Sequence, residues 1–391
     1  MIGNDKCPVC LSGSIRDFLF RRNVPVHQNL LIKDRHSAIN VPRGDLDLAV
    51  CEECGFVFNR AFDPNRLQYG PAYENAQYHS PSFDDYLSDL ANHIVSERNV
   101  RNSNIVEVGC GQGYFLRKLV EYPGAENVGF GFDPSYQGEL IQLDGRLRFE
   151  RCYYDETCAN VPADVVISRH VIEHVPDPLK MLRTIKAALV NSKDARIFCE
   201  TPCVEWILRG RVIWDFFYEH CSYFTATSLA TAFEVAGFKV ESVQHVFEGQ
   251  YLWLEATLAD EENNEIRRTR GPVLRLAGEF ARCEQQMKDA WREKIKEMAA
   301  LEKIALWGAG AKGVTFANLI DQQANYIDSI VDVNPQKQGC FVPGTGHSII
   351  GPEGLEKRGI ATAILMNPNY RDENLALLRQ SGLEVRLIEK I

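Results

Sequence analysis

The sequence contains no uninterrupted run of the roughly 18 apolar residues that a membrane-spanning helix needs. Its first residues, MIGNDKCPVC, lack the basic stretch followed by an apolar stretch that marks a secretory signal. Basic residues are not in excess either, because 43 Lys and Arg stand against 53 Asp and Glu, which gives a formal net charge of −10. These absences predict a cytoplasmic protein with neither a membrane nor a nucleic acid as its partner.

The 391 residues show no internal repeat and no low-complexity tract, and 45% of them are hydrophobic, as in an ordinary globular protein. A chain of this length exceeds what one hydrophobic core usually organises, so several domains are expected. Changes in the texture of the sequence predict three: a small cysteine-containing module over residues 1–65, an α/β domain entered by a tyrosine-rich connector over residues 66–262, and a helical spacer with a second α/β unit over residues 263–391.

A disulfide framework is not expected in a cytoplasmic chain, so the twelve cysteines are better explained by metal ligation and free buried thiols. Two Cys-x-x-Cys pairs stand out, with 40 residues between them, and their members are Cys7, Cys10, Cys51 and Cys54. Each pair can place two thiolates on one tetrahedral zinc ion. Four sulfur ligands leave no open position, so the pattern predicts a structural Zn²⁺ site; the alternative is four unrelated reduced cysteines.

From about Asn104, short apolar runs alternate with amphipathic stretches, which predicts a parallel sheet flanked by helices. The first run, residues 105–108, ends in the phrase E-V-G-C-G-Q-G, and an amphipathic helix is predicted over residues 114–120. Glycines at such a turn let a ligand approach the backbone closely. The next strand ends in Asp133, about 20 residues after the last glycine, where a carboxylate can accept hydrogen bonds from both ribose hydroxyls. The ligand is therefore expected to contain adenosine.

The glycine phrase distinguishes between two kinds of adenosine ligand. It lacks the G-x-G-x-x-G spacing of dinucleotide sites and is similar to the E/D-x-G-x-G-x-G phrase of class I methyltransferases, whose cofactor is S-adenosylmethionine. A glycine turn in another kind of α/β domain is the alternative. The residues expected to bind the cofactor are Tyr78, Glu107, Gly109, Gly111, Gln112, Gly113, Asp133, Ser168 and His170.

The segment His170-Val171-Ile172-Glu173-His174 also matches a zinc peptidase pattern, in which two histidines one helical turn apart hold a metal ion. It follows directly on a predicted strand, and Pro176 and Pro178 come soon after it, so a long ligand-bearing helix is not expected there. We therefore expect His170 and His174 to line a pocket or to pack.

An acid–base candidate lies in the aromatic segment WDFFYEHCSYF, where Glu219 and His220 are flanked by Tyr218 and Tyr223. Histidine is the side chain whose ordinary pKa best suits proton abstraction near neutral pH. From this segment alone, a buried structural histidine beside a surface glutamate is an equal alternative.

The order of these motifs, from the cysteine pairs through E-T-P and Y-E-H-x-S-Y-F to a final G-A-G-A-K-G and D-x-N-P-x-K-Q-G, resembles the sugar C-methyltransferase family of deoxysugar biosynthesis. The resemblance implies an α/β fold with a small N-terminal zinc module, a class I methyltransferase Rossmann-like core and a second Rossmann-like C-terminal domain. It also implies methyl transfer to carbon 3 of a nucleotide-linked 4-keto-deoxysugar.

In that family the histidine of the E-H-x-S-Y-F phrase is the proposed base, which implies His220 here. An enolate formed next to a ketone is a carbon nucleophile, and Glu219 would hold charge or orientation. Tyr218, Tyr223 or Tyr78 could then stabilise the oxyanion. The family commonly has Y-H-E-H where this chain has Phe217-Tyr218-Glu219-His220, so the resemblance leaves the stabilising role and the identity of the substrate open.

The C-terminal phrase around Gly308, Gly310, Lys312 and Gly313, with Asp332 after the next strand, fits the dinucleotide fingerprint better than the central domain does. On the motif alone it indicates NAD, so an NAD-dependent oxidoreductase is the rival function. The resemblance instead implies that this domain holds the sugar nucleotide through those four residues, with further contacts from loop residues His347, Asn369 and Tyr370.

Three questions stay open at the level of sequence. The same His and Glu pair could deprotonate a hydroxyl or an amine, which would make the enzyme a sugar O- or N-methyltransferase. A catalytically silent protein that binds S-adenosylmethionine or zinc as an interaction module is the third alternative. The chain is expected to be a monomer or a small homo-oligomer.

Overall fold

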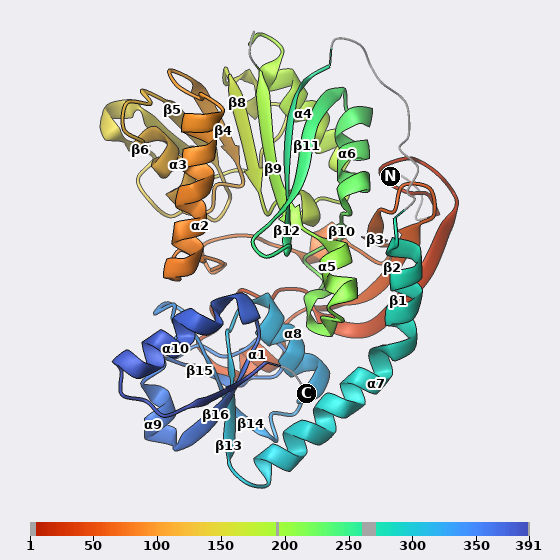
Figure 1. Cartoon of the computed structure of the whole chain (residues 1–391), viewed down its shortest axis with the longest axis vertical. Helices are drawn as coiled ribbons and strands as arrows, with labels where there is room; N and C mark the ends of the chain where they lie inside the picture. The colour runs from red at the N-terminus through yellow and green to blue at the C-terminus, as the bar shows by residue number, and fades with distance from the viewer. Residues whose placement is uncertain (1–4, 193–194, 260–270, 390–391) are drawn as a thin grey trace.

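The computed structural model describes residues 5–192, 195–259 and 271–389 (Figure 1). In these residues the strands form three sheets, and the largest follows the alternation that begins at Asn104. Its strands, in spatial order, are β11 (Phe238–Val246), β12 (Tyr251–Leu258), β9 (Arg196–Pro202), β8 (Val165–Arg169), β4 (Asn104–Val108), β5 (Val128–Phe132), β7 (Leu147–Glu150) and β6 (Ile141–Gln142).

The first strand of this sheet in the chain, β4, lies at its centre with parallel neighbours on both sides. Strand β12 is antiparallel to β9 and is inserted between β9 and β11. A largely parallel sheet with one antiparallel strand inserted next to its edge strand is the class I methyltransferase arrangement. The predicted fold class is therefore confirmed for the core. Because the loops after β4, β5 and β8 all leave from one edge of the sheet, the motifs at these strand ends converge.

Helices cover both faces of the large sheet. Helices α2 (Pro81–Asn92) and α3 (Tyr114–Val120) pack on one face through a shared apolar cluster, whereas α4 (Pro178–Leu189) and α6 (Ala226–Val235) pack on the other. Helix α2 begins at Pro81, because the Ser80 hydroxyl accepts a hydrogen bond from Phe83 N and proline suits the first helical turn. It ends at Asn92 and continues as a π-helical turn, η2 (His93–Glu97).

The N-terminal sheet contains a strand from far along the chain. Its order is β1 (Ile15–Pro25), β2 (Arg43–Cys51), β3 (Val57–Asn59) and β10 (Ser222–Tyr223), all antiparallel. Strand β10 directly follows Glu219 and His220, so the segment that carries the predicted base is paired with the N-terminal module. The remaining short elements up to β12 are α1 (Arg35–Ile39), η1 (Pro64–Arg66), η3 (Leu143–Gly145), η4 (Cys158–Asn160), η5 (Ile172–His174), α5 (Val204–Arg209) and η6 (Ile213–Asp215).

The C-terminal domain has its own parallel sheet, in the order β15 (Ser348–Ile350), β14 (Ile327–Val331), β13 (Lys303–Trp307), β16 (Ile360–Leu365) and β17 (Arg386–Ile388). This order confirms the predicted second Rossmann-like unit. The predicted spacer is the long helix α7 (Val273–Ala299), while the predicted boundary between residues 262 and 263 lies outside the described residues. The other elements are α8 (Ala311–Ile320), α9 (Gly354–Arg358), η7 (Pro368–Tyr370) and α10 (Arg371–Gln380).

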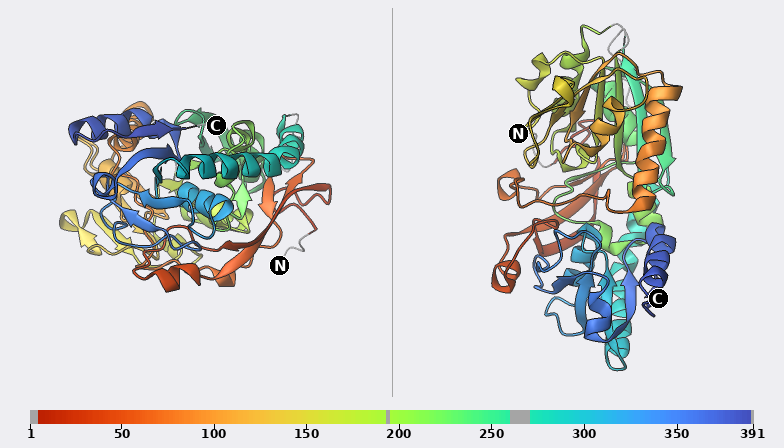
Figure 2. Two further views of the ribbon diagram at one scale, coloured as in Figure 1. Left: turned by 90° about the horizontal axis from the view of Figure 1, so that it is seen from below. Right: turned by 90° about the vertical axis from the view of Figure 1, so that its left-hand side faces the viewer.

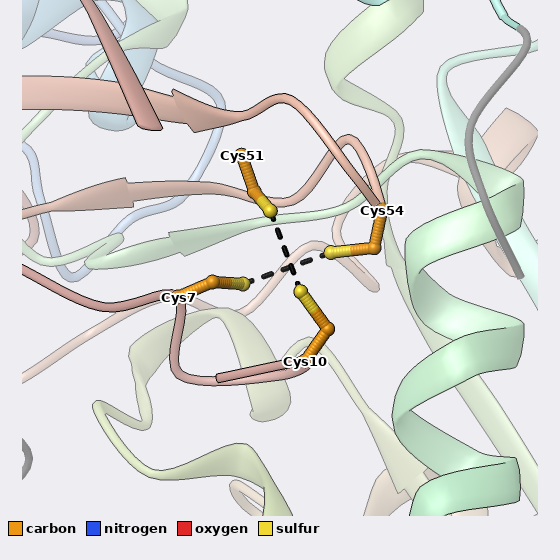
Figure 3. Close-up of side chains that lie close together, drawn as sticks. All are labelled: Cys7, Cys10, Cys51 and Cys54. Carbon is orange, nitrogen blue, oxygen red and sulfur yellow. Dashed lines mark hydrogen bonds between the residues drawn. The ribbon is translucent and has the colours of Figure 1, made fainter. Parts of the chain in front are cut away.

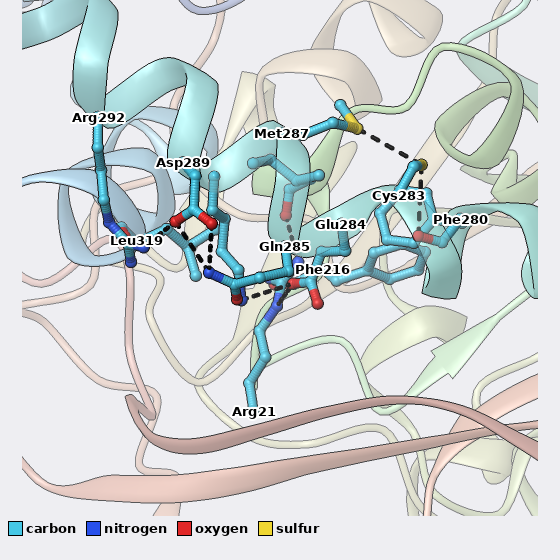
Figure 4. A network of polar contacts seen from close by, with 12 residues as sticks. Arg21, Phe216, Phe280, Cys283, Glu284, Gln285, Met287, Asp289, Arg292 and Leu319 are labelled. Carbon is cyan, nitrogen blue, oxygen red and sulfur yellow. Dashed lines mark hydrogen bonds and ion pairs between the residues drawn. The ribbon is translucent and has the colours of Figure 1, made fainter.

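A buried arginine joins the three parts of the molecule. Figure 2 shows α7 running past the N-terminal strands to the C-terminal sheet. Where it passes β1, Arg21 donates from Nε to Glu284 Oε1 at 2.8 Å and from its two Nη atoms to the carbonyl oxygens of Phe216 and Ile213 at 3.0 and 2.7 Å (Figure 4). The guanidinium therefore fixes the start of the segment that leads to His220. Within the described part of the chain, no helix has the length and apolar character that crossing a membrane requires.

Candidate active site

The glycine phrase forms a loop between β4 and α3 with left-handed backbone at three positions. A Cβ at Gly109 (φ 70°) would lie 2.2 Å from Val171, and one at Gly113 (φ 76°) would lie 2.4 Å from Phe149, so both positions need glycine. At Gly111 (φ 54°) a Cβ would meet no atom within 4 Å, because the loop faces open space there. The open space beside Gly111 leaves room for the close approach of a ligand that the phrase predicts.

Asp133, at the end of β5, is tied to the same loop. Its Oδ2 accepts from Gly111 N at 2.8 Å, and its Oδ1 accepts from the amide and hydroxyl of Ser135 at 2.7 and 2.6 Å. Gln112 donates from Nε2 to Ser135 O at 3.1 Å and so bridges the two turns. The carboxylate is thereby held at the edge of the cavity that the loop faces.

A group of buried charges lies under the glycine loop. Arg169 donates to Glu200 Oε2 at 2.6 Å, and Tyr86 donates to Glu200 Oε1 at 2.6 Å. Burial raises the pKa of Glu200, but the charges of Arg169 and His170 outweigh burial and bring it to about 2. Burial lowers the pKa of His170, but Glu200 and Glu173 outweigh it and raise that pKa to about 9. Burial, together with the nearby charge of Asp133, outweighs the opposing charge of Arg169 and raises the pKa of Glu107 to about 8.

Of these side chains, Glu107, Arg169 and His170 border one cavity of about 1070 Å³, slightly above the roughly 300–1,000 Å³ range of small-molecule sites. Its lining residues all lie between Phe62 and Thr184 in the chain. Of the predicted cofactor residues, the cavity brings together Tyr78, Glu107, Gly109, Gly111, Gln112, Asp133 and His170. Gly113 and Ser168 are not in its lining, and Ser168 is 1% exposed.

The predicted base, His220, lies beside this cavity rather than in its lining. Its ring packs edge-on against His174, which does line the cavity, with a centroid distance of 4.7 Å, and against Phe217 at 4.2 Å. The described residues give the His220 ring no hydrogen bond. Burial, followed by the neighbouring His174, His170 and Lys312 groups, holds the pKa of His220 well below 6.5. A neutral imidazole with an uncommitted nitrogen results, which is the form that accepts a proton.

Glu219 has a partner that the sequence did not indicate. Its carboxylate is 1% exposed, and Oε1 lies 2.8 Å from His27 Nδ1 of the N-terminal module. His27 Nε2 accepts from Gln68 N at 3.1 Å, so the proton of the neutral ring resides on Nδ1 and is donated to Glu219. Glu219 therefore holds the catalytic segment to the N-terminal module and makes no hydrogen bond with His220.

Two tyrosines of the connector were also missed by sequence reasoning. Tyr69 and Tyr73 both line the cavity, and Tyr69 Oη lies 3.0 Å from His174 Nδ1. The predicted oxyanion partners Tyr218 and Tyr223 are committed elsewhere: Tyr218 Oη accepts from Asp63 N at 2.8 Å, and Tyr223 Oη bonds with the backbone of Phe217 at 3.1 Å. The tyrosine-rich composition of the connector was the available signal for Tyr69 and Tyr73.

The predicted substrate residues of the C-terminal domain are not gathered around this cavity. Lys312 forms a largely buried ion pair with Asp215 of the central domain. Asn369 donates to Phe247 O and Gln250 Oε1, both at 3.3 Å, and Tyr370 packs on Phe247, so these side chains join the two domains. His347 is 2% exposed and is bonded to Thr345 and Asp321 inside its own domain. Gly308 and Gly310 lie in the turn before α8, where Asp332 accepts from Ala309 N, and Gly313 lies in the first turn of that helix.

The four predicted metal ligands converge, although two pairs come from opposite ends of the module (Figure 3). Cys7 Sγ lies 3.6 Å from Cys54 Sγ, and Cys10 Sγ lies 3.4 Å from Cys51 Sγ. Tetrahedral zinc with bonds of about 2.3 Å separates its sulfur ligands by about 3.8 Å. The thiols are buried against the core of the large sheet, so the set of donors fits a closed metal site.

Comparisons with known proteins agree with the topology. Residues 46–243, about half of the chain, match the family model described as a methyltransferase domain, and residues 253–383 match the model described as a C-methyltransferase C-terminal domain. The chain is 25% identical over 390 residues to the C-methyltransferase NovU of Streptomyces niveus, which covers 94% of this chain and 91% of that protein.

Other similarities are confined to parts of the chain. A tRNA U34 carboxymethyltransferase of Campylobacter jejuni is 32% identical over 108 residues, which is 26% of this chain and 36% of that protein. The 1,6-didemethyltoxoflavin-N1-methyltransferase of Burkholderia thailandensis, solved with S-adenosylhomocysteine, aligns with 46% of this chain and 80% of its own at 18% identity and a TM-score of 0.34. We draw no conclusion about this chain from a similarity with that TM-score.

The C-terminal domain match over residues 253–383, together with the methyltransferase-domain match over residues 46–243, selects the methyltransferase over the oxidoreductase alternative. The chain therefore belongs to the methyltransferase-domain family and is an S-adenosylmethionine-dependent enzyme.

Proposed function

We propose that the enzyme transfers a methyl group to carbon 3 of a nucleotide-linked 4-keto-deoxysugar, with His220 as the base that forms the enolate. The observation that carries this proposal is the neutral, hydrogen-bond-free ring of His220 next to the cavity that the glycine loop faces. The full-length similarity to a C-methyltransferase and the C-terminal domain match support carbon as the acceptor.

The cofactor, when bound, supplies an electrophilic sulfonium methyl group. Asp133 would accept the ribose hydroxyls, and the Gly111 backbone would allow close approach. His220 would remove the proton from the carbon next to the ketone, which leaves a carbon nucleophile aimed at the methyl group. Glu219 and His27 would position His220 through the backbone, because they fix the adjacent residue without touching the ring.

The cavity tyrosines are better placed than Tyr218 and Tyr223 to stabilise the oxyanion. Tyr69 and Tyr73 line the cavity, and burial raises the pKa of both hydroxyls, so both remain protonated donors. Tyr73 would have to exchange Glu219 Oε2, 3.4 Å from its hydroxyl, for the oxyanion. Tyr218 and Tyr223 would serve instead to hold the catalytic segment.

Lys312 and the glycine turn of the C-terminal domain remain our proposal for the diphosphate of the substrate. In this arrangement Lys312 would have to exchange Asp215 for the phosphate oxygens. We also propose that Cys7, Cys10, Cys51 and Cys54 hold a structural Zn²⁺ ion, because their sulfur separations match a tetrahedral site.

Solvent exchange tests the base directly. A nucleotide-linked 4-ketohexose is incubated in deuterium oxide with the enzyme and S-adenosylhomocysteine, and deuterium at carbon 3 is followed by NMR. Wild-type enzyme is expected to exchange this proton, and His220→Ala to exchange it at least 100-fold more slowly. His245→Ala is the matched control, because this histidine is exposed on β11 and lies outside the cavity lining. Equal exchange by wild type and His220→Ala would show that His220 is not the base.

A further inference from the structure

Three side chains, one of them the predicted base His220, bring possible metal-ligand atoms close together. One oxygen of Glu173 and one nitrogen each of His174 and His220 all lie within 4.8 Å of one another. Glu173 and His174 belong to η5 at the end of β8, whereas His220 comes from the segment before β10, so only the fold brings them together. The sequence had led us to expect packing or pocket-lining roles for His174.

Glu173 and His174 each have one polar atom hydrogen-bonded elsewhere, and the described residues give the His220 ring no hydrogen bond, so each of the three side chains can offer one ligand atom. His174 Nδ1 donates to Glu219 O at 3.0 Å, so its Nε2 is free in the neutral ring. Thr201 donates to Glu173 Oε2 at 3.1 Å. Glu173 is 1% exposed, and its Oε1 has no hydrogen-bond partner among the described residues. Ligating histidines and carboxylates are commonly oriented by such outer hydrogen bonds.

We propose that Glu173, His174 and His220 bind one divalent transition-metal ion, such as Zn²⁺ or Co²⁺, beside the cavity. Two imidazoles and one carboxylate suit this class of ion better than Mg²⁺ or Ca²⁺, which prefer oxygen ligands. Bonds of about 2.0–2.2 Å would bring the donors to about 3–3.5 Å from one another. The His220 ring can make this movement because it has no hydrogen bond to break.

One neighbouring group competes with the ion. His170 Nδ1 lies 3.4 Å from Glu173 Oε1, and His170 Nε2 lies 3.6 Å from Glu200 Oε1. Because Glu200 remains available to His170, the ion can take Glu173 without leaving His170 unpaired. The site also differs from the peptidase pattern, since His170 faces the two carboxylates and His220 replaces it as the second histidine.

The ion and the base function of His220 exclude each other, because one imidazole lone pair cannot bind a metal and accept a proton at once. This part of the inference rests on the proposed function. It predicts that the enzyme is inhibited reversibly by the ion, and that a bound ion shields His220 from chemical modification.

Cobalt titration of the full chain, with its cysteine module loaded with zinc, tests the site. Calorimetry is expected to show one further Co²⁺ bound. The absorption spectrum is expected to show weak visible bands, and none of the intense thiolate bands that exchange of Co²⁺ into the cysteine site would give. Glu173→Gln and His174→Gln are each expected to weaken binding at least tenfold. His93→Gln is the control, because His93 also lies between two carboxylates, Glu97 and Glu255, but far from the trio in the chain. No further bound ion, or equal binding in all variants, would overturn the proposal.

The exclusion is tested without a sugar substrate. Diethyl pyrocarbonate modifies free imidazole nitrogens, and the modification of His220 is measured by mass spectrometry with and without Co²⁺. The ion is expected to slow it at least tenfold in wild type and not in Glu173→Gln. Unchanged modification of His220 at saturating Co²⁺ would contradict the exclusion, whatever the enzyme does with ketosugars.

Discussion

Asp133 and Asp332 occupy equivalent positions at the ends of the second strands of two sheets. Asp133 accepts from the amides of Gly111 and Ser135, and Asp332 accepts from those of Ala309 and Asn334, all at 2.7–2.8 Å. Each therefore shapes its own glycine turn, and only the Asp133 turn faces the cavity.

We predict that Asp133→Ala weakens the binding of S-adenosylhomocysteine about tenfold to 100-fold. The hydrogen bonds that the ribose hydroxyls would donate to the charged carboxylate are worth about 1.5–3 kcal/mol. Isothermal calorimetry measures the change, and Asp332→Ala is the matched control that should bind normally. If both variants lost affinity equally, the cofactor would not depend on the cavity that Asp133 borders.

The pH dependence of methyl transfer should reflect the environment of His220. Because burial and neighbouring His174, His170 and Lys312 lower the pKa of His220, the ring stays neutral down to a pH below its ordinary value of 6.5. The acid limb of kcat/KM is therefore expected to lie below pH 6.5. A limb well above pH 7 would mean that another group is the base.

The sequence predicted best the positions of residues that belong to local motifs. The glycines and Asp133 are adjacent to strand ends, so their roles follow from spacing alone. The partnership of His27 with Glu219 spans 192 residues. No local pattern encodes it, because it arises only when the N-terminal sheet pairs with β10.

At the scale of elements, β10 and the segment before it depend on Arg21. We predict that Arg21→Met lowers the free energy of unfolding by about 3 kcal/mol, because it leaves Glu284 buried with a weaker partner. The loss is at the low end of the usual range, since Lys288 still lies 3.4 Å from Glu284.

Urea denaturation followed by circular dichroism measures this loss. Arg21→Met with Glu284→Leu removes both charges and is expected to recover more than half of the stability. The exposed pair Arg275 and Glu279 provides the control, where Arg275→Met should change little. If the double variant were no more stable than Arg21→Met alone, the uncompensated charge would not be the cause.

The order of strands in both α/β units was predictable as a class from the alternation of strands and helices. The pairing of β3 with β10 was not, since strands of two or three residues carry no periodic signal and their partners are set by packing. This pairing makes the predicted boundary at residue 65 a boundary in sequence rather than in structure.

At the scale of the whole molecule, the cysteine cluster stabilises more than its own module, because its thiols pack against the core of the large sheet. Chelation of the zinc ion that we propose for this cluster is therefore expected to lower the midpoint of thermal unfolding by several degrees, because a structural ion contributes to the free energy of folding. Cys51→Ser should lower it similarly and abolish the effect of the chelator.

The matched control is Cys283→Ser, which changes a thiol on α7 that lies outside the cluster. It should retain the wild-type midpoint and the wild-type response to chelation. A chelator that left the wild-type midpoint unchanged, with metal analysis showing that the protein was emptied, would contradict the structural role.

The most direct test of methyl transfer to carbon is the product itself. S-adenosylmethionine carrying a ¹³C methyl group is incubated with the enzyme and a nucleotide-linked 4-ketohexose, and the product is examined by carbon NMR. We expect a methyl signal that is coupled to carbon 3 of the sugar, and we expect no such signal with His220→Ala. A methyl signal at the chemical shift of an O-methyl or N-methyl group, without carbon–carbon coupling, would contradict it.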